Sequence, residues 1–352
     1  MALEQKPAET HERLAYYDKI GTANLSPLWV VFSDLVTPEP RSECRTAHWS
    51  YQHIRDWILE AGELITAKEA ERRVLILENP GLRGQSKITT SLYAGLQLVL
   101  PGEIAPAHRH TQSALRFVLE GEGAHTSVDG ERTHMSFGDF VITPPWAWHD
   151  HGNESDAPMV WLDGLDIPMA SFFDTSFAER YERDEFEVTR PEGDSHARFG
   201  ANMLPVDFRP EKMASPIFNY PYSRARETLD RLMRQQDFDP CHGVKMRYIN
   251  PVDGKDAMPT ITPCLQLLPT GFRSTPYRST DATVFVATEG SGISRVGASE
   301  INWQSRDVFV VPSWCPVVHE VAEESVLFSF SDRTAQQKLG FWREQRMSET
   351  SA

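Results

Sequence analysis

The sequence is poor in cysteine, in long apolar runs and in basic residues. These are the features typical of proteins that are stabilised by disulfides, span a membrane or bind nucleic acid. Its 352 residues include only four cysteines and no Cys-x-x-Cys pair, which favours reduced thiols in a cytoplasmic protein. Apolar runs reach about ten residues, against the roughly 20 that a membrane helix needs. Lys and Arg number 35 against 50 Asp and Glu, a formal charge of −15. We therefore expect no nucleic-acid partner and no anionic membrane partner.

What the sequence does contain is a repeat. Short apolar runs alternate with Gly, Pro and charged turns over residues 86–170 and again over 256–335, as in antiparallel sandwiches and barrels. The run LQLVLPG at 96–102 matches LQLLPTG at 265–271, and further Glu-Gly, Asp, Pro and Trp positions match in the same order. An internal duplication into two similar β domains follows.

The rest of the chain is less regular. We expect a helix within Tyr51–Ala70, from the helical spacing of its apolar residues, and another at 224–235. The predicted domains are an N-terminal, partly helical arm (1–85), a first β domain (86–170), a connector with a helix (171–255), a second β domain (256–335) and a C-terminal tail (336–352).

Histidines are concentrated in the first β domain, where six of the 12 fall within residues 108–151. His108 and His110 are two apart on a predicted strand, so their side chains share a face. His149 follows a later strand and adds a third imidazole, a ligand that suits Fe, Zn, Cu and Ni. An isolated His-x-His is more often a solvated pair, but the third histidine favours a metal site. His125 and His134 lie on a hairpin and are expected to be exposed.

The spacing resembles the two cupin motifs. The first motif, Gly-x5-His-x-His-x3-Glu-x6-Gly, is matched by Gly102, His108, His110 and Gly121. The second, Gly-x5-Pro-x-Gly-x2-His-x3-Asn, is matched by Gly138, Pro144, His149 and Asn153. Two positions depart, because Ala114 replaces the motif Glu and Trp146 replaces a motif Gly. With the duplication, the resemblance implies a mainly β bicupin, that is, two jelly-roll β-barrel domains.

The second β domain has lost these ligands. Tyr277 and Ser279 align with His108 and His110, and Val317 aligns with His149. We therefore expect the second cupin to be degenerate and metal-free.

The missing Glu at position 114 selects a kind of chemistry. Three neutral imidazoles leave a divalent metal its full charge and three open positions. A dianionic chelating acid can fill two of them and leave one for dioxygen. This fits a ring-cleaving dioxygenase that acts on an ortho-hydroxy aromatic acid, chemistry that a redox-inert metal such as zinc does not support.

A longer stretch resembles the gentisate 1,2-dioxygenase family, which includes salicylate and 1-hydroxy-2-naphthoate dioxygenases. The similar segments are ERRVLILENPGL, PGEIAPAHRHTQSALRFVLEGEG, WAWHDHGNE and WLDGLDIP, all between residues 71 and 168. The resemblance implies one Fe(II) per subunit in the first cupin, a homotetramer, and insertion of both oxygen atoms between the carboxyl- and hydroxyl-bearing ring carbons. Gentisate would give maleylpyruvate.

Residues near the predicted ligands complete the site. Arg116 lies on the next predicted strand, where an inward guanidinium needs an anion and suits a carboxylate. The family resemblance also implies that Arg116 and Arg72 contact the substrate. Gly95 and Gln97 share a face of the preceding strand, so Gly95 would leave room for the ring and Gln97 could hydrogen-bond a substrate hydroxyl or dioxygen. Further candidates are Tyr93 and Trp146 for the substrate, His151 for proton transfer, and Asp163 for positioning a ligand.

Alternatives remain at this point. Salicylate or 1-hydroxy-2-naphthoate could replace gentisate as the substrate. A non-redox metal cupin that binds an aromatic acid would fit the same three histidines. Each single candidate, apart from the metal ligands, could also be an ordinary strand, loop or core residue.

Overall fold

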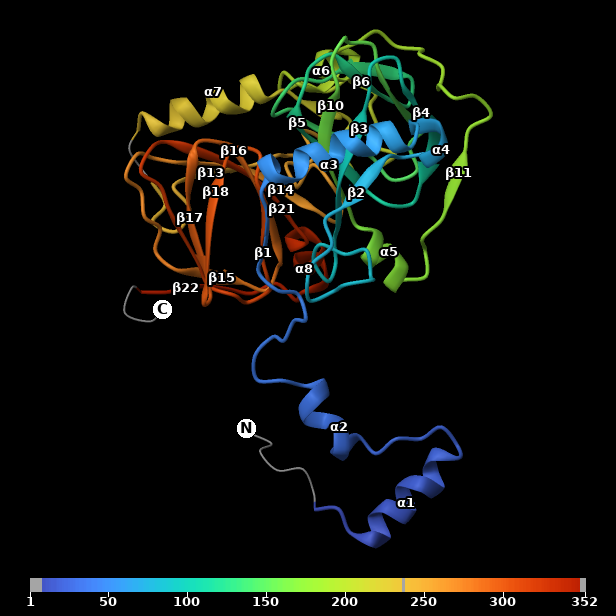
Figure 1. The fold of residues 1–352 in the computed structure, drawn as a ribbon, viewed down its shortest axis with the longest axis vertical. Coiled ribbons are helices and arrows are strands. Elements are labelled where there is room, and N and C mark those ends of the chain that lie inside the picture. The colour runs from blue at the N-terminus through green and yellow to red at the C-terminus, as the bar shows by residue number, and fades with distance from the viewer. Residues whose placement is uncertain (1–7, 236–237, 349–352) are drawn as a thin grey trace. The chain divides into compact units, whose positions relative to one another are not determined.

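The computed structural model describes residues 8–235 and 238–348, which fall into two compact units. The unit that ends at Arg41 holds helices α1 (His11–Gly21) and α2 (Leu28–Leu35), and neither helix has a buried residue. Within it the Trp29 indole Nε1 donates to the Tyr17 hydroxyl at 2.9 Å. The unit from Ser42 onward contains everything described below (Figure 1). The outermost residues of the predicted arm and tail, 1–7 and 349–352, lie outside the described residues.

The first barrel consists of two facing sheets. Their strands are β3 (Tyr93–Val99), β4 (Ile104–His110), β5 (Ala114–Glu120), β6 (Ala124–Val128), β7 (Glu131–His134), β8 (Phe140–Thr143), β9 (His149–Asn153) and β10 (Met159–Leu165). One sheet has the order β12-β8-β5-β10-β3-β2 and the other β11-β4-β9-β6-β7. This is a jelly roll, and its alternating residues form the predicted inner and outer faces.

The second barrel repeats the arrangement, as the duplication predicts. Its strands are β14 (Thr262–Leu268), β15 (Tyr277–Ser279), β16 (Thr283–Glu289), β17 (Ser291–Val296), β18 (Ser299–Gln304), β19 (Val308–Val311), β20 (Val317–Glu320) and β21 (Ser325–Ser331). The sheets have the orders β1-β19-β16-β21-β14-β13 and β18-β17-β20-β15-β22. The mainly β bicupin fold is thereby confirmed.

Segments outside the two β domains extend these sheets. The predicted arm supplies β1 (Ala47–Trp49) to the second barrel and β2 (Val74–Ile76) to the first. The connector adds β11 (Ala178–Arg180), β12 (Asn219–Tyr220) and β13 (Val244–Arg247), and the tail adds β22 (Glu344–Arg346). The domain boundaries stay a prediction, but strands from the arm and the connector are built into both barrels.

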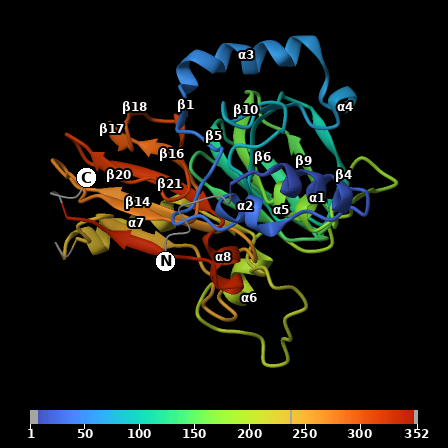
Figure 2. The same ribbon diagram turned by 90° about the horizontal axis from the view of Figure 1, so that it is seen from below.

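Helices cover the outside of the barrels. The helices predicted in Tyr51–Ala70 and at 224–235 are confirmed as α3 (Tyr51–Leu64) and α7 (Tyr222–Met233), which pack on β3 and on β13 and β14. Figure 2 shows these two helices on opposite sides. The remaining helices are short: α4 (Ala67–Ala70), α5 (Ile167–Phe172), α6 (Asp194–Phe199) and α8 (Arg333–Leu339). None of the helices in the described residues has the length and apolarity needed to cross a bilayer.

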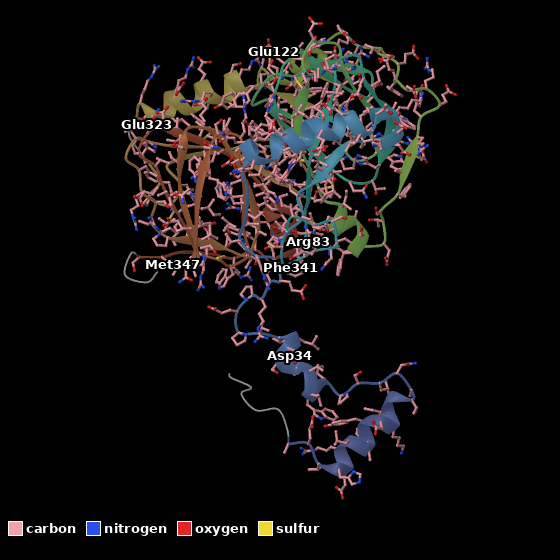
Figure 3. The ribbon with its side chains drawn as sticks, in the orientation of Figure 1. Asp34, Arg83, Glu122, Glu323, Phe341 and Met347 are labelled. Carbon is pink, nitrogen blue, oxygen red and sulfur yellow. The ribbon has the colours of Figure 1, made fainter. Side chains whose placement is uncertain are left out.

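A shared aromatic core joins the barrels. The Phe117 ring of the first stacks on the Phe328 ring of the second, with centroids 4.1 Å apart. Gly164 lies so close to Phe330 that a Cβ there would meet the ring at 2.9 Å. Side chains fill the spaces between the ribbons throughout both barrels (Figure 3). The two barrels therefore share one hydrophobic core and are not independent domains joined by a linker.

One expected exposure is wrong. His134 is exposed, but His125 is buried at 1% exposure. The β6–β7 hairpin turns at Asp129-Gly130, both with positive φ. The connector then folds over the hairpin: Ser195 donates to Glu131, and the Phe186 amide donates to Asp150. Since this cover comes from a distant segment, the local pattern of the hairpin could not reveal it.

Candidate metal centre and substrate pocket

The three predicted metal ligands meet at one point inside the first barrel. Strands β4 and β9 pair so that His108 lies directly opposite His149. The ring centroids are 4.2 Å apart for His108 and His149, 4.9 Å for His110 and His149, and 5.3 Å for His108 and His110. One ligand nitrogen from each ring lies within 4.8 Å of the others, and no other such cluster of three occurs among the residues that the structure describes.

Backbone carbonyls orient all three rings. The Nδ1 atom of each lies by a carbonyl oxygen two residues away: His108 by Pro106 at 3.3 Å, His110 by Gln112 at 3.0 Å and His149 by Ala147 at 2.9 Å. A carbonyl only accepts, so the Nδ1 atoms of His110 and His149 carry the hydrogen and their Nε2 atoms keep the lone pair. His108 Nδ1 also contacts the Arg72 guanidinium, which only donates. The buried His149 Nε2 has no hydrogen-bond partner. Three rings that each bring one nitrogen within 4.8 Å of the others fit a metal ion.

The surroundings also hold the imidazoles in their neutral, metal-binding form. Burial, followed by the positive charge of Arg72, lowers the pKa of His108 to about 2. Burial and then Arg116 lower the pKa of His110 to about 4. The pKa of His149 is well below its usual range, mainly because the ring is buried. A cationic metal could replace the protons that this site rejects.

Arg116 points into the same barrel and is only partly bonded. Its Nη1 donates to the Thr143 hydroxyl at 2.6 Å, and its Nε lies 3.5 Å from Asp163 Oδ1. That ion pair is too long for a hydrogen bond of Nε, which is buried without a partner. Asp163 also accepts from the Trp161 indole at 3.1 Å, and burial raises its pKa to about 6 despite Arg116. The guanidinium therefore has donor capacity left for a carboxylate.

Arg72 approaches the centre from the chain just before β2. Its Nη2 donates to the Pro106 carbonyl oxygen at 2.8 Å and also contacts His108 Nδ1. Burial, and then repulsion from Arg116, lowers its pKa to about 9. An anion between the two guanidinium groups would relieve that repulsion. The neighbouring Arg73 turns away and pairs with Glu103. Of the two adjacent arginines, Arg72 is therefore the one that faces the histidine cluster.

Strand β3 presents three of the predicted substrate residues on one face. Gln97 and Gly95 lie opposite Trp161 and Asp163 of β10, and Tyr93 follows on the same face. The Gln97 amide has no hydrogen-bond partner among the described residues, although only 2% of the residue is exposed. A Cβ at Gly95 would lie 2.4 Å from Val74 Cγ1 and 3.0 Å from the Tyr93 hydroxyl. Gly95 thus makes room for Val74; that it also makes room for an aromatic ring stays a prediction.

His151 lies beside the ligands with one free nitrogen. Its ring centroid is 5.6 Å from that of His149, and its Nδ1 is 3.0 Å from the Thr126 hydroxyl. Its Nε2 is buried without a partner. Burial keeps its pKa well below the usual range, so the ring is neutral at pH 7 and Nε2 can exchange a hydrogen bond with a ligand.

Trp146 is joined to these residues only through its backbone, where its amide donates to the His110 carbonyl oxygen at 2.8 Å. Its ring packs on Phe177 and on the Arg109 guanidinium, 4.5 Å from the centroid. Arg109 lies between the two ligand histidines on β4 and therefore points to the opposite face. The predicted role of Trp146 as a wall of the substrate pocket stays a prediction.

Two supporting hydroxyls and one covering strand were missed by sequence reasoning. Thr143 bonds Arg116 and Thr126 bonds His151, and strand alternation around the cupin motifs could have flagged both. Strand β11 pairs along β4 beside His108 and His110. Nothing local in its sequence, Ala-Glu-Arg, signals that position.

In the second barrel other residue types stand at the positions of the three ligands. Tyr277 of β15 pairs with Val317 of β20, in the place where His108 pairs with His149. Neither side chain is a usual ligand for a transition metal, and Ser279 stands where the first barrel has His110.

Comparisons with known proteins agree with this geometry. A cupin-domain family profile matches residues 95–165. Gentisate 1,2 dioxygenase 1 from Aquipseudomonas alcaligenes is 62% identical over 98% of this chain and 100% of its own length. A 1-hydroxy-2-naphthoate 1,2-dioxygenase from Nocardioides sp. strain KP7 is 33% identical over 87% of this chain and 80% of its own. The crystal structure of a salicylate 1,2-dioxygenase adduct with gentisate, from Pseudoaminobacter salicylatoxidans, superposes with a TM-score of 0.91 at 33% identity, covering 98% of this chain and 97% of that one.

Proposed function

Since the chain belongs to the gentisate 1,2-dioxygenase family of ring-cleaving enzymes, we propose that it cleaves gentisate with dioxygen between the carboxyl- and hydroxyl-bearing carbons, giving maleylpyruvate. The observation that carries this proposal is a buried cluster of three neutral imidazoles with the partly bonded Arg116 close enough to lower the pKa of His110. The cluster provides a metal site, and the arginine provides a carboxylate anchor beside it.

We propose iron(II), one ion per chain, held by His108, His110 and His149. Iron(II) supplies electrons to dioxygen, which a redox-inert ion such as zinc does not. The protein's part is to hold the His110 and His149 Nε2 lone pairs toward the ion through the carbonyl contacts of Nδ1, with His108 opposite His149 on the paired strand. These contacts fix each ring before any ion arrives.

The positive groups would bind and orient the substrate. Arg116 offers its unbonded Nε–H and the rest of its fork to the carboxylate, and Arg72 offers a second contact on the side of His108. Because no carboxylate belongs to the ligand set, the metal keeps one more unit of charge than in a cupin with a Glu ligand. At about 4 Å and an effective dielectric near 20, that unit is worth about 4 kcal/mol to an anion before desolvation costs.

The remaining pocket residues would handle protons and hydroxyls. His151 Nε2 can accept a hydrogen bond from the phenolic hydroxyl while Nδ1 holds its hydrogen against the Thr126 hydroxyl. Gln97 has a free amide for a ring hydroxyl, and Tyr93 stays protonated because burial raises its pKa. Asp163 positions Arg116 rather than touching the substrate.

Salicylate and 1-hydroxy-2-naphthoate are the competing substrates, because two relatives with this fold are named as dioxygenases of these acids. Gentisate carries a second hydroxyl para to the first, so its ring is richer in electrons and easier to oxidise. That difference favours gentisate. The 62% identity with a gentisate 1,2 dioxygenase points the same way.

An oxygen-electrode assay tests the proposal. Protein reconstituted anaerobically with iron(II) is mixed with gentisate, salicylate or 1-hydroxy-2-naphthoate, and zinc-loaded protein serves as the control. We expect one dioxygen consumed per gentisate, faster than with the other two acids, and none with zinc. A lack of uptake with every acid would instead favour a non-redox cupin that binds an aromatic acid.

Assembly and location are part of the proposal. We propose a homotetramer, which light scattering on the purified protein tests. All four cysteines are unpaired, which favours a reducing compartment such as the cytoplasm.

A further inference from the structure

The second barrel has kept a cavity in the place where the first barrel has its site. Its volume is about 50 Å³. It lies between the sheets, bounded by inward residues of β13, β14, β16 and β21 on one side and of β15 and β20 on the other. Its polar lining includes His242, Lys245, Gln266, His319 and Arg333.

Part of the first site is preserved there without its metal ligands. Gln266 stands where the first barrel has Gln97, 169 residues earlier. His319 contacts the Ser294 hydroxyl through Nδ1 at 2.8 Å, as His151 contacts Thr126. The duplication thus retained the amide and the hydroxyl-bonded histidine, which are polar groups that an apolar core would have no reason to keep.

The cavity is positively charged inside an acidic chain. Among its lining residues the cations are Lys245, Arg278 and Arg333, and the one carboxylate is Asp281. Neither Lys245 nor Arg333 has an ion-pair partner within residues 8–235 and 238–348. Lys245 lies opposite Gln266 on the paired strand, with its ammonium 5.7 Å from the Phe285 ring centroid. An ammonium group in such a place has charge left for an anion.

The Gln266 side-chain amide adds a second requirement for a ligand, beside the negative charge that the cations call for. Gln266 Nε2 donates to the His242 carbonyl oxygen at 2.8 Å, which fixes the orientation of the group. Its Oε1 is buried and accepts no hydrogen bond. A ligand that satisfies the cavity must therefore donate one hydrogen bond as well as bring negative charge.

Size narrows the choice to a few heavy atoms, because about 50 Å³ is under twice the volume that one water occupies in the liquid. A wider opening of about 250 Å³, lined partly by His242, Lys245 and Arg333, adjoins the cavity on the side of β13. We propose that the second barrel binds a small oxyanion that carries an O–H group, with bicarbonate as the model ligand.

Bicarbonate and nitrate make a matched pair of probes, since both are planar monoanions and only bicarbonate donates a hydrogen bond. The holoenzyme is first saturated with gentisate under anaerobic conditions, which occupies the first barrel without turnover. Each anion is then titrated calorimetrically at pH 8 and fixed ionic strength. We expect one site per chain, with bicarbonate about tenfold tighter than nitrate.

Three variants separate the contributions. Lys245→Met should weaken both anions about tenfold, and Gln266→Leu should remove the preference for bicarbonate. Lys255→Met removes an exposed lysine of the same barrel that pairs with Asp253 and should change neither affinity. Gentisate turnover and circular dichroism confirm folding of each variant.

The proposal is overturned if neither anion binds to the gentisate-saturated enzyme. It is equally overturned if Lys245→Met and Lys255→Met weaken binding to the same extent, because the anions would then be responding to net charge alone. A preference for bicarbonate that survives in Gln266→Leu would remove the role of the amide.

Discussion

Replacing Arg116 by Met tests the substrate anchor most directly. Met fills much of the same volume but offers no donor. The free part of the guanidinium would make about two charge-assisted hydrogen bonds to a carboxylate, each worth roughly 1.5–3 kcal/mol. We take about 3 kcal/mol as the net loss after competition with water, and at about 1.4 kcal/mol per decade kcat/KM for gentisate should fall on the order of a hundredfold.

The structure adds a pH signature to this variant. In the wild type Asp163 has a pKa near 6, because burial raises it while Arg116 lowers it. Without Arg116 that pKa must rise further, so Asp163 is largely protonated at pH 7 and ionises at higher pH. An unpaired carboxylate beside the substrate repels it. The Arg116→Met enzyme should therefore lose more activity between pH 7 and 8.5 than the wild type, and adding Asp163→Asn should remove that extra loss.

The assay is anaerobic gentisate binding together with oxygen uptake at pH 7 and 8.5. The neutral analogue 2,5-dihydroxybenzamide should bind wild type and Arg116→Met with similar affinity, since it lacks the charge that Arg116 recognises. Arg132→Met is the matched control, because Arg132 pairs with Glu154 and Glu185 on the outside of the barrel. A gentisate kcat/KM within threefold of the wild type in Arg116→Met would refute the anchor.

Three further predictions concern the metal, its charge and the second barrel. His149→Ala should reduce the bound metal from one ion per chain to almost none by elemental analysis, whereas the exposed His134→Ala should keep it; equal retention would remove His149 from the ligand set. Ala114→Glu should slow oxygen uptake at least about tenfold by lowering the net charge of the metal site by one unit, and its neutral isostere Ala114→Gln should be slowed clearly less; equal rates for the two would contradict the charge argument. Burial lowers the pKa of His319 to about 3, against about 6.5 in an unfolded chain. The unfolded state therefore takes up a proton first as the pH falls below 6.5, and by pH 5 this costs about 2 kcal/mol of folding free energy. Urea unfolding at pH 7.5 and 5 should show that loss to be smaller in His319→Gln, and an unchanged loss would mean that His319 is not held neutral.

Local periodicity was enough to predict much of the site. Side chains two apart on a strand share a face, so the pairing of His108 with His110 and the inward direction of Arg116 follow from the sequence. The internal repeat likewise predicts the two barrels and the replacement of the ligand histidines by Tyr277 and Val317. These features depend on neighbours in the chain or on a spacing that the chain itself repeats.

Features made by distant segments could not be predicted in this way. The His125 ring packs on Gly152 of β9, and the connector covers the same hairpin at Glu131 and Asp150. The cover over β4 depends on a three-residue strand without a pattern of its own. Trp146 is a predicted pocket residue because it flanks the metal ligand His149 in the sequence. Its observed neighbours, Arg109 and Phe177, come from the far face of β4 and from the connector.

Strand β1 has a consequence for how the protein is made. It lies near the start of the chain, yet its partner in the sheet is β19, where Ala47 pairs with Val310. A ribosome that builds the chain from the N-terminus releases β1 long before that partner exists, so this edge stays open while the first barrel is assembled. A message truncated between the first barrel and β19 yields a barrel with the histidine cluster and an unpaired strand, prone to join other chains. Selection against such products gives the second barrel a reason to persist that is independent of anything it binds.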